Sequence, residues 1–242
     1  MYLSRLRLNP RSRAVWRDLA DCQAMHRTVM SGFRATQLPG DARAACGVLH
    51  RVEVNPRTGA VTLMVQSKEM PDWSWLDGYL LDTTGEEDNP ACKQVDHLYE
   101  SISHGTVLAF RLRANPTRKI DTKSGPDSVR RNGRRVELSG QKEQIDWLRR
   151  KGEQGGFRLL TVRAAPAAPD MATVPNVLAM PAQKAVGDRG GKGGSRMTFG
   201  AVLFDGELEV ENAEAFRRTL ETGIGPGKAY GFGLLSVAPL VR

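Results

Sequence analysis

The sequence predicts an α+β fold of two tandem domains. Short strand patterns and amphipathic helix patterns follow one another as β-α-β-β-α over residues 1–80, and the order β-α-β-β-α-β occurs in the second half. This order is typical of a ferredoxin-like domain, in which an antiparallel sheet is backed by two helices. A chain of 242 residues is long enough for two such domains, each with its own core. The repeat is one of architecture, because the residues themselves do not repeat.

In the first half, an amphipathic helical region follows the opening strand. Residues 2–8 alternate as a strand, and Asn9-Pro10 ends it. Apolar side chains then recur every three or four residues from Val15 to Phe33, after Ser12 as the candidate N-cap. Asp21-Cys22-Gln23 is a candidate break within this region. We therefore expect either one helix or two short ones.

A hairpin and a further helical start complete this half. Residues 46–55 and 60–68 have strand patterns, and the intervening Pro56-Arg57-Thr58-Gly59 predicts a hairpin. Residues 71–76 are typical of a capped helical start with inward aromatic side chains. The stretch 83–97 is acidic, polar and broken by proline, so we interpret it as the boundary between domains. The predicted domains are residues 1–95 and 96–242.

The second half repeats the order of elements with longer connections. The expected elements are strands at 106–114, 157–163 and 234–237, a hairpin at 197–210 around Asp205-Gly206, and helices at 140–152 and 213–221. The helix at 140–152 ends in Arg149-Arg150-Lys151, which suits the helix dipole. Residues 164–181 hold four prolines and 187–195 are rich in glycine, so neither stretch predicts regular structure.

The charge of the chain indicates a polyanionic partner. The net charge is +8, and the nine basic and two acidic residues between Arg111 and Arg135 contribute +7 of it. Such a concentration is typical of nucleic-acid binding, and a solvated basic loop without a ligand is the alternative.

Composition points to a cytoplasmic protein. Hydrophobic content of 40% and charged content of 26% are ordinary for a soluble globular chain. There is no apolar run near the roughly 20 residues that span a bilayer, and no signal-peptide pattern. The three cysteines indicate neither a disulfide framework nor a zinc site. We therefore expect no membrane association, no metal and no small-molecule cofactor.

A glycine-rich stretch precedes the last strand. Five glycines and Lys228 fall within residues 223–233, where backbone N–H groups and the ammonium group could bind an anion. A tight turn into the strand is the alternative. The spacing excludes both a Walker A loop and a dinucleotide fingerprint, because Thr222, Ala229 and Tyr230 stand where those motifs need glycine or serine/threonine. We therefore expect any phosphate bound here to belong to a phosphate chain.

Three stretches carry a family resemblance. They are Tyr2-Leu-Ser-Arg-Leu with Met25-His26, Phe110-Arg-Leu-Arg-Ala-Asn-Pro116, and Gly223-Ile-Gly-Pro-Gly-Lys through Gly233-Leu-Leu-Ser-Val-Ala-Pro239. Together they resemble the CasE family, the CRISPR RNA-processing endoribonucleases of type I-E Cascade complexes within the RAMP superfamily. The resemblance runs from the first residue to the last strand and is weak around 164–196. It implies two ferredoxin-like, RRM-like domains.

The resemblance also implies an activity and its partners. The activity is metal-independent cleavage of precursor CRISPR RNA at the base of the repeat hairpin, with the product retained alongside the other Cascade subunits. The reaction is attack by a ribose 2′-OH on the adjacent phosphate, which expels the 5′-oxygen of the next nucleotide. A catalytically weak or inactive hairpin-binding subunit of the same complex is the alternative function. A protein–protein scaffold would leave the basic segment unexplained.

The implied catalytic residue is His26, which follows Met25 as the family's catalytic histidine follows a methionine. On residues alone, a histidine beside an apolar stripe would be structural. Imidazole suits acid–base catalysis because it gains or loses a proton near neutral pH. Family members often have tyrosine and lysine where this chain has Gln23 and Ser31. Gln23 can orient a hydroxyl but cannot exchange a proton, and Ser31 carries no charge.

The implied RNA-binding residues come from the basic segment and the glycine-rich stretch. Gly231 and Gly233 are expected to be packing positions, and Tyr230 and Phe232 either pack or stack on a base. The expected phosphate contacts are Arg113, Arg118, Lys119, Arg130, Arg131, Arg134, Arg135, Gly225, Gly227 and Lys228.

Overall fold

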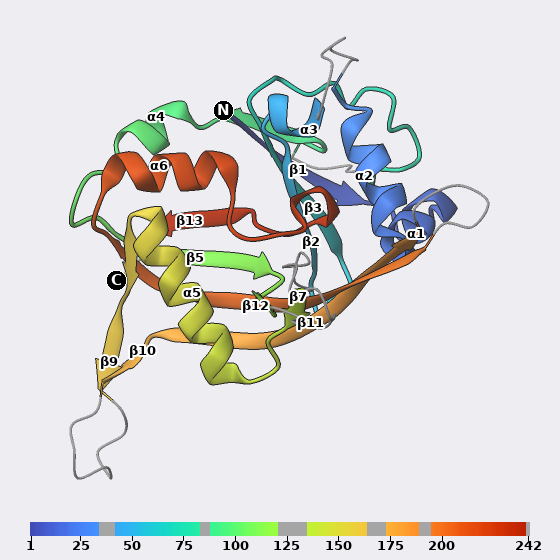
Figure 1. Ribbon diagram of the computed structural model, residues 1–242. Helices are drawn as coiled ribbons and strands as arrows, with labels where there is room; N and C mark the ends of the chain where they lie inside the picture. The colour runs from blue at the N-terminus through green and yellow to red at the C-terminus, as the bar shows by residue number, and fades with distance from the viewer. Residues whose placement is uncertain (34–41, 83–87, 121–134, 164–172, 189–194, 241–242) are drawn as a thin grey trace, which may run out of the picture.

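The protein folds into two α+β units that pack against each other (Figure 1). The computed structural model describes residues 1–33, 42–82, 88–120, 135–163, 173–188 and 195–240. Among these residues, no helix is long and apolar enough to cross a membrane.

The first unit is an antiparallel sheet with helices on one face. Its strands are β1 (Tyr2–Leu8), β2 (Leu49–Val54), β3 (Val61–Ser67) and β4 (Ala91–Gln94), in the order β2-β3-β1-β4. This is the ferredoxin-like order that the sequence predicts. The helices are α1 (Arg13–Ala20), α2 (Cys22–Met30) and the short α3 (Ala42–Ala45). Val15, Met25 and Val29 of α1 and α2 pack on Leu6 and Leu63 of the sheet to form the core.

Local chemistry explains two features of this unit. The amphipathic region divides at Asp21, whose side chain accepts a hydrogen bond from the Gln23 N–H (2.8 Å) and caps α2. Ser12 occupies the N-cap position of α1, but its side chain makes no capping hydrogen bond. The β2–β3 hairpin turns as predicted, with Gly59 at φ +70° donating its N–H to the Asn55 carbonyl oxygen.

One prediction for this unit is wrong. Residues 71–76 form no helix and turn only at Ser74 and Trp75, where the Asp72 carboxylate accepts from the N–H and hydroxyl of Ser74. Trp73 is nevertheless buried as expected, with its ring against Gly32, whereas Trp75 is exposed. The stretch 83–97, which the sequence predicts as the domain boundary, contains β4, and β4 pairs with β1 in the first sheet.

The second unit has the same strand order. Its strands are β5 (Val107–Ala114), β8 (Phe157–Leu159), β11 (Val177–Asp188), β12 (Arg196–Val210) and β13 (Leu235–Pro239). The order is β11-β12-β5-β13, and β8 also pairs with β12. Helices α5 (Gln141–Gly155) and α6 (Ala213–Thr222) lie side by side over one face of this sheet (Figure 1). The core between them contains Phe157, Phe204 and Phe216.

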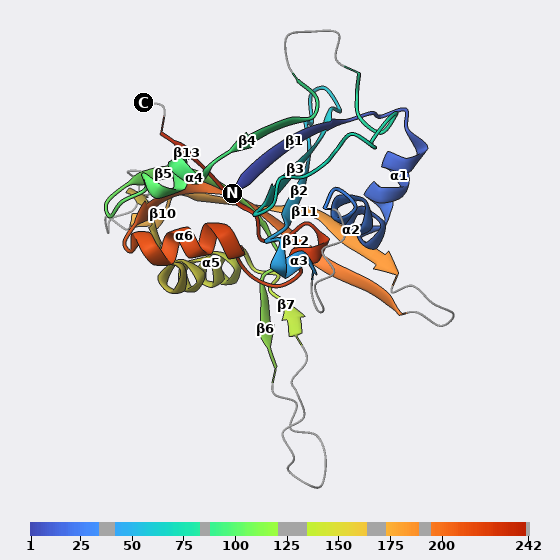
Figure 2. The same cartoon turned by 90° about the horizontal axis from the view of Figure 1, so that it is seen from above.

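Two short ribbons and one helix complete the second unit. Strands β6 (Thr117–Lys119) and β7 (Arg135–Glu137) form a ribbon that projects from the body (Figure 2). Strands β9 (Thr161–Arg163) and β10 (Thr173–Pro175) form another ribbon, which lies between β8 and β11 in the sequence. Helix α4 (Asp96–Glu100) places Tyr99 against the second core, so we propose the domain boundary at residues 95 and 96.

The sequence mispredicts the centre of the second sheet. Asp205-Gly206 lies inside the continuous strand β12, so the predicted hairpin there is wrong. Gly206 instead allows the backbone at Asn176 to approach closely, since a Cβ at position 206 would lie 2.5 Å from the Asn176 carbonyl oxygen. The hairpin partner of β12 is β11, which the sequence analysis missed because it contains Pro181. Proline is tolerated here because β11 is an edge strand.

The two units are joined by a buried guanidinium group. Arg51 of β2 is 3% exposed, and its Nη1 donates to the carbonyl oxygens of Leu234 (3.0 Å) and Arg111 (3.2 Å) in the second unit. Its Nη2 donates to Ser236 Oγ (3.0 Å), and its Nε donates to Glu53 Oε1 (2.8 Å). Burial lowers the pKa of Arg51, and the hydrogen bonds compensate for the lost solvation.

A long hairpin makes a second contact between the units. Strands β11 and β12 extend from the second sheet toward α1 and α2 (Figures 1 and 2). A Cβ at Gly187 of β11 would lie 2.7 Å from Asp21 Oδ1 and 2.8 Å from Cys22 Sγ. Cys22 packs with Ala185 and Ala201 in a small apolar cluster. The units therefore touch along α2 as well as along β2.

We expect Arg51→Met to lower the free energy of unfolding by on the order of 3 kcal/mol, because it leaves buried acceptors unpaired. Urea unfolding followed by circular dichroism would measure this loss. Arg218→Met is the control, since Arg218 is exposed and forms an ion pair with Glu214 on the surface of α6. The control should change the free energy by less than about 0.5 kcal/mol. Equal effects of the two substitutions would contradict the role of Arg51.

Candidate functional site

The glycine loop, residues 223–233, connects α6 to β13. Its centre is the short 3-10 helix η1 (Lys228–Tyr230), flanked by Gly227 and Gly231 in left-handed conformation. A Cβ at Gly231 would lie 3.2 Å from Arg113 Nη1 and 3.4 Å from His50 Nε2. The loop therefore needs glycine both for its positive φ angles and for its close approach to the first unit.

The side chain of Arg113 on β5 binds the glycine loop. Its Nη1 donates to the Gly231 carbonyl oxygen (3.2 Å) and its Nη2 to the Gln183 carbonyl oxygen (2.7 Å). Its guanidinium carbon lies 4.4 Å from the centroid of the Phe232 ring. Burial lowers the pKa of Arg113 to about 10. The sequence predicts a phosphate contact here, whereas in the structure the side chain of Arg113 contacts the glycine loop.

His26 lies where the loop meets α2. Its ring centroid is 6.2 Å from that of Tyr230 in η1, with an edge-to-face angle of 69°. Tyr230 in turn stacks on Phe199 of β12, with centroids 5.0 Å apart. Phe232 is fully buried, which agrees with a packing role for that aromatic residue. The imidazole of His26 is therefore bordered by elements of both units.

His50 is a second histidine at this place, and the sequence analysis missed it. It lies on β2, is 2% exposed, and its Nε2 faces Gly231 across the loop. Burial is the main cause that lowers its pKa to about 3, and the positive charges of His26 and Arg113 add to the effect. His50 therefore stays neutral near neutral pH. The position of His50 in a predicted strand gave no sign that it lies close to the glycine loop and His26.

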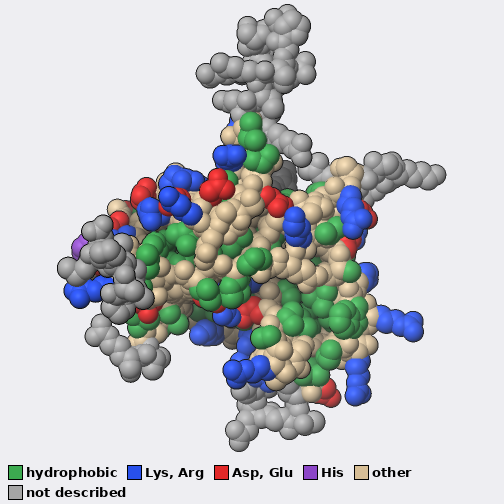
Figure 3. All heavy atoms as spheres, turned by 90° about the horizontal axis from the view of Figure 1, so that it is seen from below, with side chains coloured by type: hydrophobic (Ala, Val, Ile, Leu, Met, Phe, Trp, Pro, Cys, Tyr) green, Lys and Arg blue, Asp and Glu red, His purple; other side chains and the backbone are tan. Residues whose placement is uncertain are grey.

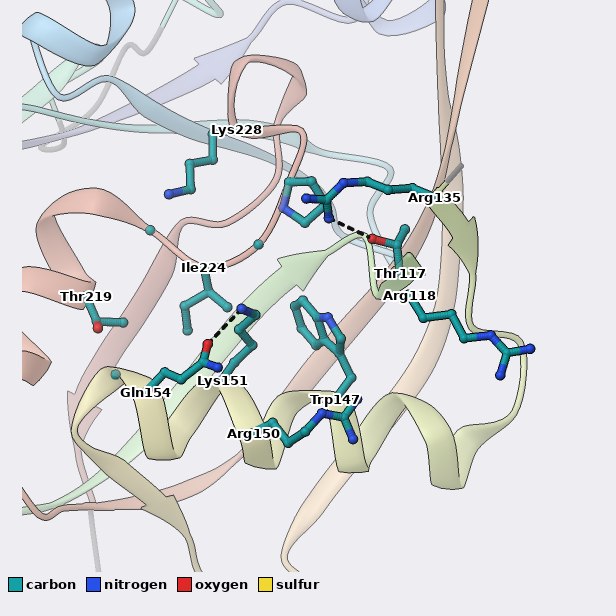
Figure 4. A pocket seen from close by; sticks show the side chains of 14 residues that line it. Thr117, Arg118, Arg135, Trp147, Arg150, Lys151, Gln154, Thr219, Ile224 and Lys228 are labelled. Atoms are coloured by element: carbon teal, nitrogen blue, oxygen red, sulfur yellow. Dashed lines mark hydrogen bonds between the residues drawn. The ribbon is translucent and has the colours of Figure 1, made fainter. Parts of the chain in front are cut away.

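A basic groove lies on the other side of the glycine loop (Figure 4). The cavity is about 580 Å³ in volume. Helix α5 contributes Arg150 and Lys151 to its lining, and the β6–β7 ribbon contributes Arg118 and Arg135. Lys228 lines it from the loop, and burial together with the charges of Arg43 and Lys151 lowers its pKa. The described residues that line the groove include no carboxylate, so the groove suits a polyanion.

Other parts of the surface are less basic than this groove. The face in Figure 3 mixes basic, acidic and hydrophobic side chains without a continuous basic band. A second cavity of about 290 Å³ lies between the two units near β4 and β13, and among the described residues of its lining only Lys93 is charged. Both observations favour the groove beside the glycine loop as the binding surface for a polyanion.

The structure brings together only some of the expected RNA contacts. Arg118, Arg135, Gly225 and Lys228 all line the groove. Lys119, which is exposed on β6, and Gly227, which lies against the Phe232 ring, are not part of its lining. The predicted contacts at Arg130, Arg131 and Arg134 fall outside the described residues.

The two residues expected beside His26 carry no ionisable group. The backbone N–H of Gln23 bonds to Asp21, and Ser31 ends α2 with its hydroxyl donating to the Thr28 carbonyl oxygen (2.8 Å). Among the described residues, no group of three or more histidine, cysteine, aspartate or glutamate side chains could hold a metal ion.

Arg150 and Lys151 are groove residues that the sequence analysis misinterpreted. The sequence predicts a helix over 140–152 that Gly155-Gly156 ends, and it places Arg150 and Lys151 in a basic last turn. Helix α5 continues to Gly155, and Gly156 ends it in left-handed conformation. Arg150 and Lys151 therefore lie within the helix. Their spacing from Trp147 and Gln154 places all four on one helix face, which was a usable signal.

Comparisons with known proteins cover almost the whole chain. The model of a family described as "CRISPR associated protein" matches residues 1–239. The CRISPR-associated endoribonuclease Cse3 of Thermus thermophilus is 37% identical over 240 residues, covering 99% of this chain and 100% of the relative. The Cascade subunit CasE of Escherichia coli K12 is 32% identical over 242 residues, again covering 99% and 100%. A solved structure of Thermus thermophilus Cse3, bound to an RNA representing a pre-cleavage complex, matches with a TM-score of 0.73 at 35% identity and covers 98% of both chains.

The buried state of His50 predicts a pH dependence of stability. Its pKa in the folded protein lies far below the unfolded value near 6.5, so the unfolded chain binds the proton first as pH falls. The stabilising contribution is therefore complete above pH 6.5 and is lost toward pH 3. Between pH 7 and pH 5 we expect this group alone to remove about 2 kcal/mol from the free energy of unfolding.

Denaturant unfolding of His50→Gln across this range checks the assignment, because the variant should lose the corresponding part of the slope. His97→Gln, which removes an exposed histidine of α4, is the matched control. An unchanged slope in His50→Gln would refute a neutral, buried His50.

Proposed function

The chain belongs to the family of CRISPR-associated proteins, and we propose that it is an endoribonuclease that cleaves precursor CRISPR RNA at the base of the repeat hairpin. One observation carries the proposal. The glycine loop presents Lys228 to the basic groove and, two residues later, Tyr230 to the His26 ring. A phosphate backbone lying in the groove would thus continue toward the imidazole.

In this proposal the groove holds the hairpin stem through its phosphates. Arg118 and Arg135 approach from the projecting ribbon, while Arg150 and Lys151 approach from α5 (Figure 4). Cations on both sides suit an RNA duplex, which proteins recognise largely by shape and by backbone contacts. The related Thermus thermophilus Cse3 has been solved bound to RNA, which supports an RNA ligand for this chain.

His26 is the proposed acid–base catalyst. A ribose 2′-OH attacks the adjacent phosphorus, so that a bond forms between the 2′-oxygen and phosphorus. The bond between phosphorus and the 5′-oxygen of the next nucleotide breaks. The imidazole can take the proton from the 2′-OH or give one to the leaving 5′-oxygen. Gln23 would orient the hydroxyl, and Ser31 would add at most a neutral hydrogen bond. We propose that the reaction needs no metal ion.

The proposal also includes the cellular setting. CasE of Escherichia coli is named as a Cascade subunit, and we propose that this chain keeps its cleaved product within a type I-E Cascade in the cytoplasm. The absence of an ionisable side chain at positions 23 and 31 favours one alternative, a hairpin-binding subunit with weak or no cleavage. Both functions use the same groove and differ in turnover.

We expect His26→Ala to lower the cleavage rate by about 10²–10⁴-fold, because it removes the proton-transfer group, and to leave the hairpin Kd within about twofold. A labelled CRISPR-repeat hairpin incubated in EDTA, with the ends mapped, would measure the rate and reveal a single cut leaving a 5′-hydroxyl. Cleavage by His26→Ala at the wild-type rate would remove His26 from this role. Tight binding by the wild type without a cut would support the subunit alternative.

We also expect Arg150→Ala to weaken hairpin binding and to reduce the slope of log Kd against log salt by about one, since one phosphate contact is lost. The neighbouring Arg149→Ala is the matched control, because Arg149 pairs with Asp146 (3.1 Å) and is not part of the groove lining. Filter binding between 50 and 200 mM salt would compare them. Equal slopes for both variants would show that the stem lies elsewhere.

A further inference from the structure

An aromatic series runs across the contact between the two units and ends at His26. Phe199 of β12 stacks on Tyr230 (5.0 Å, 28°), and Tyr230 meets the His26 ring edge to face (6.2 Å, 69°). The three side chains come from a strand, the glycine loop and α2, which are far apart in the sequence. In the function proposed above, Tyr230 marks where the glycine loop meets His26, and neither Phe199 nor Tyr230 is given a task in the reaction.

We propose that Tyr230 is the positioning residue for His26: its ring holds the imidazole in the orientation needed for proton transfer. The inference rests on the proposed function, because it concerns the same cleavage reaction. The proposed role belongs to the aromatic ring of Tyr230, because its contact with His26 is an edge-to-face contact between the two rings. The phenol hydroxyl is not required for it.

Tyr230 is rigid enough for this task. Its backbone N–H donates to the Gly227 carbonyl oxygen (2.8 Å), and left-handed glycines stand on both sides of η1. Its stacking partner Phe199 also packs near Phe232, at 6.1 Å between centroids. Phe232 is fully buried beneath the Arg113 guanidinium. The Tyr230 ring therefore cannot rotate away without disturbing a packed cluster.

The composition of the site explains why positioning matters in this chain. Helix α2 supplies His26, but Gln23 and Ser31 on the same helix offer no proton-exchanging partner. Because neither of these side chains can share the proton transfer, the rate depends more strongly on how well the imidazole is aligned. A fixed aromatic wall limits the rotation of the imidazole about its side-chain bonds. Edge-to-face contacts of this kind are favourable by about 2- to 10-fold in an equilibrium constant.

The test compares Tyr230→Leu with Tyr230→Phe in the full-length protein. We expect Tyr230→Leu to lower the single-turnover cleavage rate of the repeat hairpin about tenfold or more, with Kd within about twofold. Tyr230→Phe should restore most of the lost rate, because it keeps the ring. Tyr2→Leu, which removes a half-buried tyrosine at the start of β1, is the control for loss of a tyrosine as such.

A spectroscopic readout separates positioning from general destabilisation. The ring protons of His26 should experience a ring-current shift in the free protein, which Tyr230→Leu removes and Tyr230→Phe retains. If Tyr230→Leu does not fold, Phe199→Leu provides the second test, since it removes the stacking partner and should lower the rate in the same direction at unchanged Kd.

The opposing results are distinct. Wild-type cleavage by Tyr230→Leu overturns the inference, and so does a loss in Tyr230→Phe as large as that in Tyr230→Leu, which would assign the role to the hydroxyl. A raised Kd with an unchanged rate would make Tyr230 an RNA-stacking residue instead. A wild-type protein that binds the hairpin but does not cut it overturns the proposed function, and with it any catalytic purpose of the contact.

Discussion

The geometry of the site depends on one buried charge, the Arg51 guanidinium between the two units. Removing a guanidinium from water is unfavourable unless most of its donors find acceptors in good geometry. Arg51 meets this condition only when Leu234, Arg111 and Ser236 of the second unit stand in one arrangement. Two of these acceptors lie on or next to β13, directly after the glycine loop. Fixing the two units against each other therefore also fixes the loop relative to His26.

The glycine loop converts this fixed arrangement into a continuous surface. Gly231 lets the backbone pass between Arg113 and His50, and Gly227 reverses the chain over Phe232. Because these conformations exclude side chains, the loop is thin at the point where the two units meet. His50 can lie behind it as a neutral histidine, which adds no charge to a region that already contains Arg43, Arg113 and Lys228. The loop thus serves packing and binding at once.

Features set by neighbouring residues could be predicted from the sequence, whereas those set by distant residues could not. The strands β1, β2 and β3, the break at Asp21 and the turn at Gly59 follow from periodicity and local turn chemistry. Strand β11 was missed because Pro181 is acceptable only at the edge of a sheet, a position that the sequence does not reveal. Arg113 looked like part of a basic segment, but its partners lie near residues 183 and 231. His50 was overlooked for the same reason.

The contact between His26 and Tyr230 also has a consequence for biosynthesis. The two residues are separated by nearly the whole chain, and a chain is made from its N-terminus at about 5–20 residues per second. The first sheet and α2 can form on the ribosome well before the glycine loop is translated. During that interval the emerging polypeptide has neither the groove nor the wall beside its imidazole. Newly made protein therefore cannot act on RNA in the polysome until translation of the loop is complete and β13 has paired with β5.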